Sequence, residues 1–158
     1  MSKRNKYFLY FSFILIGLFI FACFSIIYSV IKLNQASAAE RTGSTLGLVA
    51  LFLYLVIVSI ALVYAIRAYQ NKSVLVAVVM VDDRGNKNPR SYRNSLIFAG
   101  IFVVFGIFFF LNSFGIISLT KILTTSINLV LTNVGLGIAA VSFYLYFYKP
   151  IPKEELDN

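Results

Sequence analysis

The stretch LGLVALFLYLVIVSIALVYAI, residues 46–66, contains no Asp, Glu, Lys, Arg or His. A helix needs about 20 apolar residues to cross a hydrocarbon layer about 30 Å thick, so this stretch predicts a membrane span. Three further runs are free of ionisable acids and bases in the same way: residues 7–31, 96–111 and 122–148. The third reaches the required length only if its helix continues through Asn112 and Ser113, as far as Leu119. The sequence therefore predicts an all-α membrane protein, a four-transmembrane-helix bundle.

The composition supports this class. The chain has 158 residues, of which 59% are hydrophobic and 13% charged, whereas a soluble domain is about 45–50% apolar and about 25% charged. We therefore expect one domain over residues 1–158. Its elements are expected at residues 7–31, 46–66, 96–119 and 122–148, with a cytoplasmic loop at 67–95. The net charge of +8 does not indicate nucleic-acid binding, because the basic residues flank apolar spans instead of forming a patch with stacking aromatics.

The basic residues also predict the orientation in the membrane. Eleven of the fourteen lie in the N-terminal segment, the middle loop and the C-terminal tail, and three lie in the other two connections. Basic residues are retained on the cytoplasmic side, so both termini and the middle loop are expected there. The richness in Ile, Phe, Asn, Lys and Tyr favours a bacterial source. The predicted location is a bacterial plasma membrane, crossed several times.

The first span has competing interpretations. Lys3 and Arg4 precede a long apolar stretch, and Ala36-Ser37-Ala38 resembles a signal-peptidase site. The core of a signal peptide is about 7–15 residues long, however, and this run is longer, which favours an uncleaved anchor helix. A lipoprotein site at Cys23 is disfavoured because Phe21 occupies a position where such sites have a small residue.

The middle loop is distinctive because residues 74–81, VLVAVVMV, are mostly β-branched. Such a segment favours extended structure, and it is too short to span the membrane. We expect this short β-prone segment to pair with residues 88–93 as a hairpin, to lie on the membrane, or to add to the sheet of a partner. The basic residues of the loop are candidates for contact with a partner or with anionic lipid headgroups: Arg84, Lys87, Arg90 and Arg93.

The two outer connections are short. Residues 32–45 read as a polar continuation of a helix or a helical cap. The second connection either turns early, at Asn112-Ser113-Phe114-Gly115, or stays helical to Ser118 and turns at Thr120-Lys121. An early turn would leave residues 116–127 along the outer interface.

Small and polar residues follow helical spacing in the last span. Thr125, Asn128 and Thr132 lie on one side of it, and Asn133 lies on a neighbouring side, with Asn112 in the third span. Two interpretations fit this pattern. One is hydrogen bonding between helices, worth about 0.6 kcal/mol per bond on average. The other is a polar path or ligand site lined by these five residues.

Candidate functions follow from what the chain lacks. It has no His and one Cys, and its six acids all lie outside the apolar runs, so we expect no catalytic residues, no metal site and no cofactor. The leading hypothesis is a non-catalytic multi-pass membrane protein that acts through protein–protein contacts, as an accessory subunit, scaffold or immunity-type protein. The alternative is a small oligomeric transporter or pore for a polar solute. Expected partners are the lipid bilayer and a protein partner or further copies of the chain.

Overall fold

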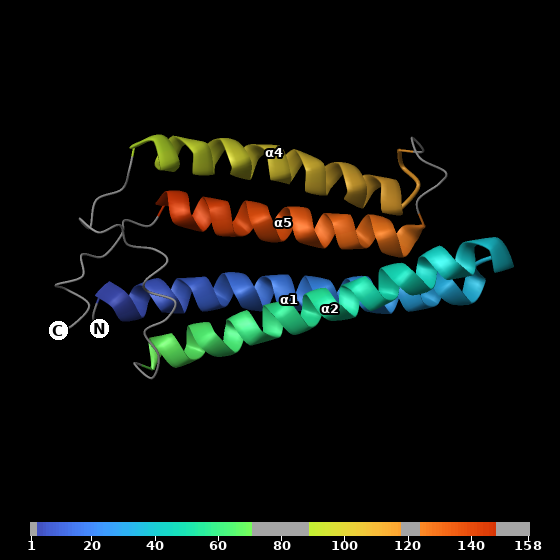
Figure 1. Ribbon diagram of the computed structural model, residues 1–158, viewed down its shortest axis with the longest axis horizontal. Coiled ribbons are helices and arrows are strands. Elements are labelled where there is room, and N and C mark those ends of the chain that lie inside the picture. The colour runs from blue at the N-terminus through green and yellow to red at the C-terminus, as the bar shows by residue number, and fades with distance from the viewer. Residues whose placement is uncertain (1–2, 71–88, 118–123, 148–158) are drawn as a thin grey trace.

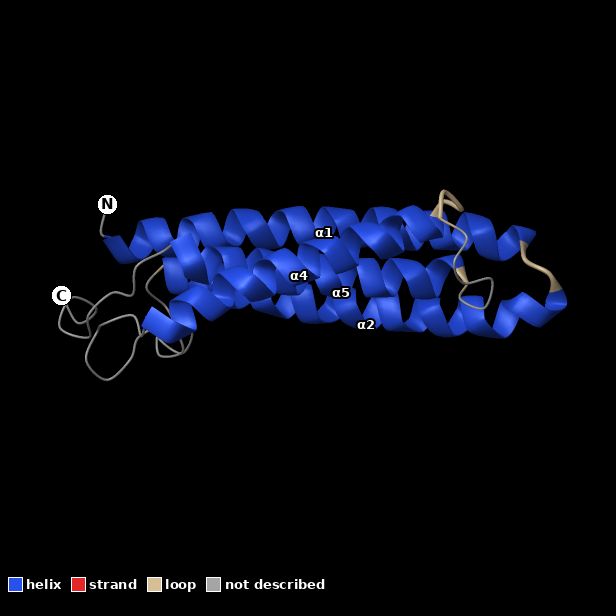
Figure 2. Cartoon of the chain, turned by 90° about the horizontal axis from the view of Figure 1, so that it is seen from above, coloured by secondary structure: helices blue, strands red, loops and turns tan. Residues whose placement is uncertain are grey.

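The computed structural model describes residues 3–70, 89–117 and 124–147. These residues form four α-helices: α1 (Lys3–Gln35), α2 (Ala38–Tyr69), α4 (Pro89–Ser113) and α5 (Thr125–Phe147). The part of the chain so described is all-helical. The helices run side by side along the long axis of an elongated bundle (Figures 1 and 2). Each of them includes a segment long and apolar enough to cross a membrane.

Helix α5 is the central helix. It packs against α4 on one side and against both α1 and α2 on the other, whereas α4 packs mainly against α5. Figure 1 shows α5 between α4 and the α1–α2 pair. Accordingly, 39% of the α5 span is buried, against 22% or less for the other three spans. The small and polar residues of α5 therefore lie in the most buried of these four spans.

The bundle has two distinct ends. Helix α1 begins and α5 ends at the same end, which we call the terminal end (Figure 1). The other end, called the turn end, holds the connection between α1 and α2 and the start of α5. The α1–α2 pair extends beyond α4 and α5 there, because α1 has 33 residues and α5 has 23.

The connection from α1 to α2 consists of Ala36 and Ser37. Ser37 caps α2: its carbonyl accepts hydrogen bonds from the amides of Glu40 and Arg41 at 3.1 Å each. The Glu40 carboxylate reaches back to accept from the Ser37 amide at 3.4 Å. The S-x-x-E sequence of residues 37–40 is that of a capping box, and one half of the motif, the bond from the Ser37 amide to the Glu40 carboxylate, is formed. Residues 32–45, expected to be a polar continuation of a helix or a helical cap, form the end of α1, this two-residue connection and the start of α2.

The connection after α4 turns early. Helix α4 ends at Ser113, and Gly115 has a φ of +73°, a left-handed conformation that suits glycine. The alternative of a helix continuing to Ser118 is therefore wrong, and so is the extension of the third span to Leu119. The span is longer than expected at its N-terminal end. The candidate segment is Asn94–Ser113, and the helix itself starts at Pro89. Proline is favoured in the first helical turn, where its missing amide proton is not needed.

The expected middle loop is only partly described. Helix α2 continues to Tyr69, and residues 89–93 belong to α4, so they do not form the second strand of a hairpin. The β-prone segment 74–81 lies outside the described residues. Its two other interpretations, contact with the membrane and addition to the sheet of a partner, remain predictions.

Glycines bring α5 close to its neighbours. A Cβ atom added at Gly47 in α2 would lie 2.8 Å from the Ile127 backbone nitrogen of α5. A Cβ atom at Gly135 in α5 would lie 3.4 Å from the Gly106 Cα of α4. Close backbone approach at small residues is the usual way in which membrane helices associate. The packing of α5 therefore depends on glycines of α2 and α4 as well as on its own.

Candidate functional site

Polar side chains are buried inside the bundle on all four helices. Helix α5 itself buries Ser126, Asn128, Thr132 and Asn133, each 2% exposed or less. The neighbouring helices bury further polar residues: Ser12, Ser25 and Ser29 in α1, Ser44 in α2, and Asn112 and Ser113 in α4. A buried polar group costs free energy unless it is hydrogen-bonded, so the partners of these groups decide what the cluster does.

Asn128 links α5 to α4. The Asn112 side-chain amide donates to the Asn128 Oδ1 at 3.0 Å, and both side chains are buried. On the same side of α5, the Thr132 hydroxyl donates to the Asn128 backbone carbonyl at 2.8 Å. Three of the five residues expected to form a packing face or polar path are thus joined in one hydrogen-bonded group.

Asn133 links α5 to α1. Its side-chain amide donates to the Ser25 Oγ and to the Leu129 backbone carbonyl, at 2.8 Å each. The Ser25 hydroxyl in turn donates to the Phe21 carbonyl at 2.9 Å. Because residues 25 and 133 are far apart in the sequence, this contact fixes how the first and last helices pack.

Three buried polar atoms have no hydrogen-bond partner among the described residues. They are the Ser29 Oγ, the Asn133 Oδ1 and the Tyr54 Oη. The Tyr54 hydroxyl packs against Gly137, where an added Cβ would lie 2.7 Å from it. Ser29 is 1% exposed and lies one helical turn from Ser25, toward the turn end.

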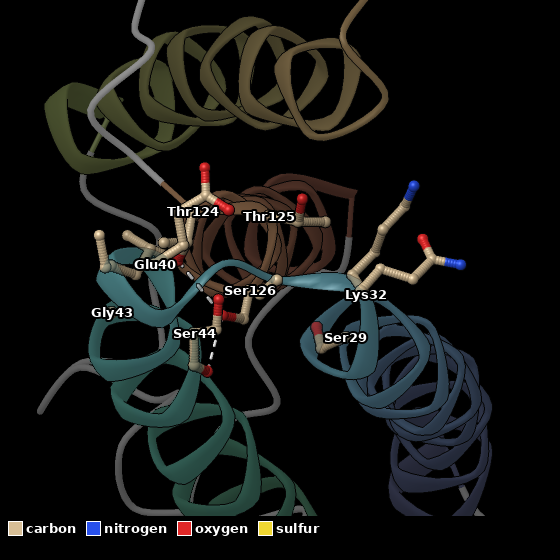
Figure 3. A pocket seen from close by; sticks show the side chains of 12 residues that line it. Ser29, Lys32, Glu40, Gly43, Ser44, Thr124, Thr125 and Ser126 are labelled. Carbon is tan, nitrogen blue, oxygen red and sulfur yellow. Dashed lines mark hydrogen bonds between the residues drawn. The ribbon is translucent and has the colours of Figure 1, made fainter.

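A pocket opens at the turn end, where α1, α2 and α5 come together (Figure 3). Its volume is about 440 Å³, within the range of about 300–1,000 Å³ typical of small-molecule sites. The walls come from the last turns of α1, the first turns of α2 and the start of α5. The lining residues are Ser29, Lys32, Gln35, Ala36, Ala39, Glu40, Gly43, Ser44 and residues 124–127.

Hydrogen bonds hold the start of α5 against α2 at the pocket. The Ser126 hydroxyl donates to the Ser44 carbonyl at 2.8 Å, and the Thr124 and Ser126 hydroxyls are 3.3 Å apart. The first i to i−4 bond of the helix runs from the Asn128 amide to the Thr124 carbonyl at 3.1 Å. The amides of residues 125–127 come before this bond and have no acceptor within the helix. Such amides bond to capping side chains or to ligands.

Among the described residues that line the pocket, one is a cation and one is an anion. Lys32 lies on the α1 wall, with its ammonium 5.7 Å from the centre of the Tyr28 ring. Glu40 lies on the α2 wall. The described residues contain no group of three or more His, Cys, Asp or Glu side chains that would hold a metal ion. The chemistry available here is charge pairing and hydrogen bonding from hydroxyls and amides.

The structure brings together most of the predicted residues, but in two places. Asn112, Asn128, Thr132 and Asn133 lie buried between helices, whereas Thr125 is partly exposed and lines the pocket. Of the basic residues expected to contact a partner or lipid, two lie in the first turns of α4, at positions 90 and 93. The other two, Arg84 and Lys87, lie outside the described residues.

Sequence reasoning missed the pocket. Its residues come from segments that were expected to be a loop or a span end, and none of them belongs to a motif of a known ligand site. One signal was available: Gly43 and Gly47 form a G-x-x-x-G pattern, a mark of close helix packing. A Cβ at Gly43 would lie 2.9 Å from the Thr124 methyl group. Extending the second span to include Gly43 would have predicted that α2 meets another helix there.

No protein-family model, curated protein or solved structure matches this chain.

Proposed function

We propose that the chain is a non-catalytic multi-pass membrane protein that acts through contacts with other proteins in the membrane, as an accessory subunit, scaffold or immunity-type protein. In this proposal it resides in a bacterial plasma membrane with both termini in the cytoplasm. Arg84, Lys87, Arg90 and Arg93 contact a partner or anionic headgroups at the cytoplasmic face.

The observation that carries the proposal is the use of the α5 polar side chains inside the bundle. Asn128 and Asn133 bond to α4 and α1, and Thr132 bonds within α5. Groups that hold helices together are not free to line a path for a solute. This arrangement favours a packed bundle whose function lies on its surface.

The outward surface of the bundle is apolar over the spans. Along α2, Phe52, Leu53, Val56 and Ile57 are all more than half exposed. Along α4, Ile101 and Val104 are exposed in the same way. Such faces contact lipid, and they also accept the helix of another membrane protein, since the association of membrane helices relies on close packing.

Crosslinking in intact cells, followed by extraction in mild detergent and identification of the neighbours, tests the proposal. We expect a stable complex with a defined second membrane protein at fixed stoichiometry. Leu replacements of Val56 and Ile60, which keep the surface apolar but change its shape, should weaken the complex if α2 is the contact face. Recovery of the chain alone under all crosslinking conditions would contradict the proposal.

A second candidate is a small oligomeric transporter or pore for a polar solute. The observation in its favour is the polar pocket at the turn end, with the unpartnered Ser29 and Asn133 atoms deeper between α1 and α5. Solute flux into liposomes that contain only the purified chain would support it. The variant N128L/T132L should abolish that flux if these residues line a path, and should only alter assembly if they are packing groups.

A further inference from the structure

The start of α5 faces the turn-end pocket. Thr124, Thr125 and Ser126 all lie at its wall in Figure 3. The start of a helix carries partial positive charge, and its first amides are free to donate hydrogen bonds, so it favours a bound anion. Helix α5 has 23 residues, which is long enough for its aligned peptide dipoles to act together.

An independent observation points to a ligand at the same place. Ser29 lines the pocket from α1 and is 1% exposed, and its hydroxyl has no hydrogen-bond partner within the described part of the chain. Two other buried serines of the bundle, Ser25 and Ser126, both donate to backbone carbonyls. A serine hydroxyl can donate one hydrogen bond and accept others, so a ligand oxygen in the pocket would satisfy Ser29.

The charged side chains define the ligand further. Lys32 adds a cation on the α1 side, and Glu40 places an anion on the α2 side (Figure 3). Neither makes an ion pair within 4.0 Å among the described residues. A ligand with only negative charge would gain from Lys32 and the start of α5, and would be repelled by Glu40. A ligand with a negative group and an adjacent ammonium group would pair favourably with Lys32 on the α1 side and with Glu40 on the α2 side.

We propose that the turn-end pocket binds a phosphate ester that carries an ammonium group. The phosphate oxygens accept from the first amides of α5, from the Ser29 hydroxyl and from the Lys32 ammonium. The ammonium group of the ligand pairs with the Glu40 carboxylate. This binding site is independent of the proposed contact function, since it makes no use of the outward faces of α2 and α4.

Two sources carry this chemistry: an aminophospholipid headgroup and a soluble phosphoester. The depth of the pocket favours the lipid. The candidate span of α5 begins at Thr125 and has 20 residues, which cover about 30 Å in helix, the thickness of the hydrocarbon layer. The pocket at the first turn of α5 therefore lies at the level of the headgroups.

The test uses the full chain in vesicles of equal parts phosphatidylethanolamine and phosphatidylglycerol. After extraction in mild detergent, native mass spectrometry measures which lipid stays bound. We expect phosphatidylethanolamine to be retained roughly tenfold over phosphatidylglycerol, since charge-assisted hydrogen bonds are the strong ones. K32Q and S29A should each lower total lipid retention several-fold. E40Q should remove the preference between the two lipids while phosphate binding persists.

Matched control variants separate the site from the general surface. R41Q removes a cation at the same end that does not line the pocket. S12A removes a buried serine hydroxyl that donates to the Phe8 carbonyl. Both variants should leave the total lipid retention and the preference for phosphatidylethanolamine unchanged. Equal retention of the two lipids by the unchanged protein, or equal effects of K32Q and R41Q, would overturn the proposal.

A second arm distinguishes the sources. Soluble phosphoethanolamine is titrated into delipidated protein and, separately, into protein that holds phosphatidylethanolamine. If bound phosphatidylethanolamine prevents phosphoethanolamine from binding, the pocket is assigned to the lipid headgroup. Saturable binding that the lipid leaves unchanged, yet that K32Q weakens, assigns it to a soluble ester. Binding of inorganic phosphate as tight as that of phosphoethanolamine would refute the role of the ammonium group.

Discussion

At the scale of single residues, Gly47 shows how closely α2 and α5 approach. A Cβ at this position would lie 2.5 Å from the Ser126 Oγ, 2.7 Å from its Cβ and 2.8 Å from the Ile127 backbone nitrogen. The Ser126 side chain is itself held, because it donates to the Ser44 carbonyl. Any side chain at position 47 therefore has to move backbone atoms of the neighbouring helix.

We predict that G47A lowers the free energy of unfolding by about 1 to 3 kcal/mol, the usual cost of overpacking. This change is measured by unfolding the protein in detergent while circular dichroism monitors the loss of helix. G100A is the matched control, because an added Cβ at Gly100 meets no described atom within 4 Å. The control should be neutral or slightly stabilising, since alanine is the better helix former. Equal stability of G47A and G100A would mean that α2 and α5 are farther apart than described.

At the scale of elements, the start of α2 determines how the first two helices join. A connection of two residues leaves little freedom, so the direction of α2 depends on its first turn. The Glu40 carboxylate accepts from the Ser37 amide, and the Ser37 carbonyl accepts from the amides of Glu40 and Arg41. Glu40 also lines the turn-end pocket. One side chain thus supports the helix start and contributes charge to the candidate site.

We predict that E40A destabilises the first turn of α2 by about 0.5 to 1 kcal/mol, because the acceptor for the Ser37 amide is lost. Hydrogen exchange at the amides of residues 37–41 should become faster in this variant. E40Q keeps a side-chain oxygen at the same position, so exchange should stay near that of the unchanged protein. Equally fast exchange in the two variants would indicate that the charge, and not the hydrogen bond, stabilises the helix start.

At the scale of the whole molecule, the four helices form a bundle with two chemically different ends. The start of α1 and the end of α5 share the terminal end (Figure 1), as an even number of crossings requires. Eleven of the fourteen basic residues belong to the N-terminal segment, the middle segment and the tail. The positive-inside rule therefore predicts a cytoplasmic terminal end and a turn-end pocket that opens on the opposite side.

Cysteine labelling checks this orientation. In a C23S background, we compare Q35C at the turn end with Q70C at the terminal end, since both positions are exposed. A membrane-impermeant maleimide added to intact cells should label Q35C and should label Q70C only after permeabilisation. The opposite result would reverse the predicted topology. Labelling of both positions in intact cells would contradict the separation of the two ends by a membrane.

The sequence alone determined the class of this protein, because the length of a charge-free run is a local property that needs no knowledge of contacts. It also indicated that Asn128, Thr132 and Asn133 lie on inward-facing sides of the last helix. Only the tertiary structure decided their partners: Asn128 meets Asn112, and Asn133 meets Ser25, 108 residues away. The turn-end pocket likewise depends on the three helix ends that meet there. Such contacts follow from how the helices pack against one another, which the periodicity of each single span does not encode.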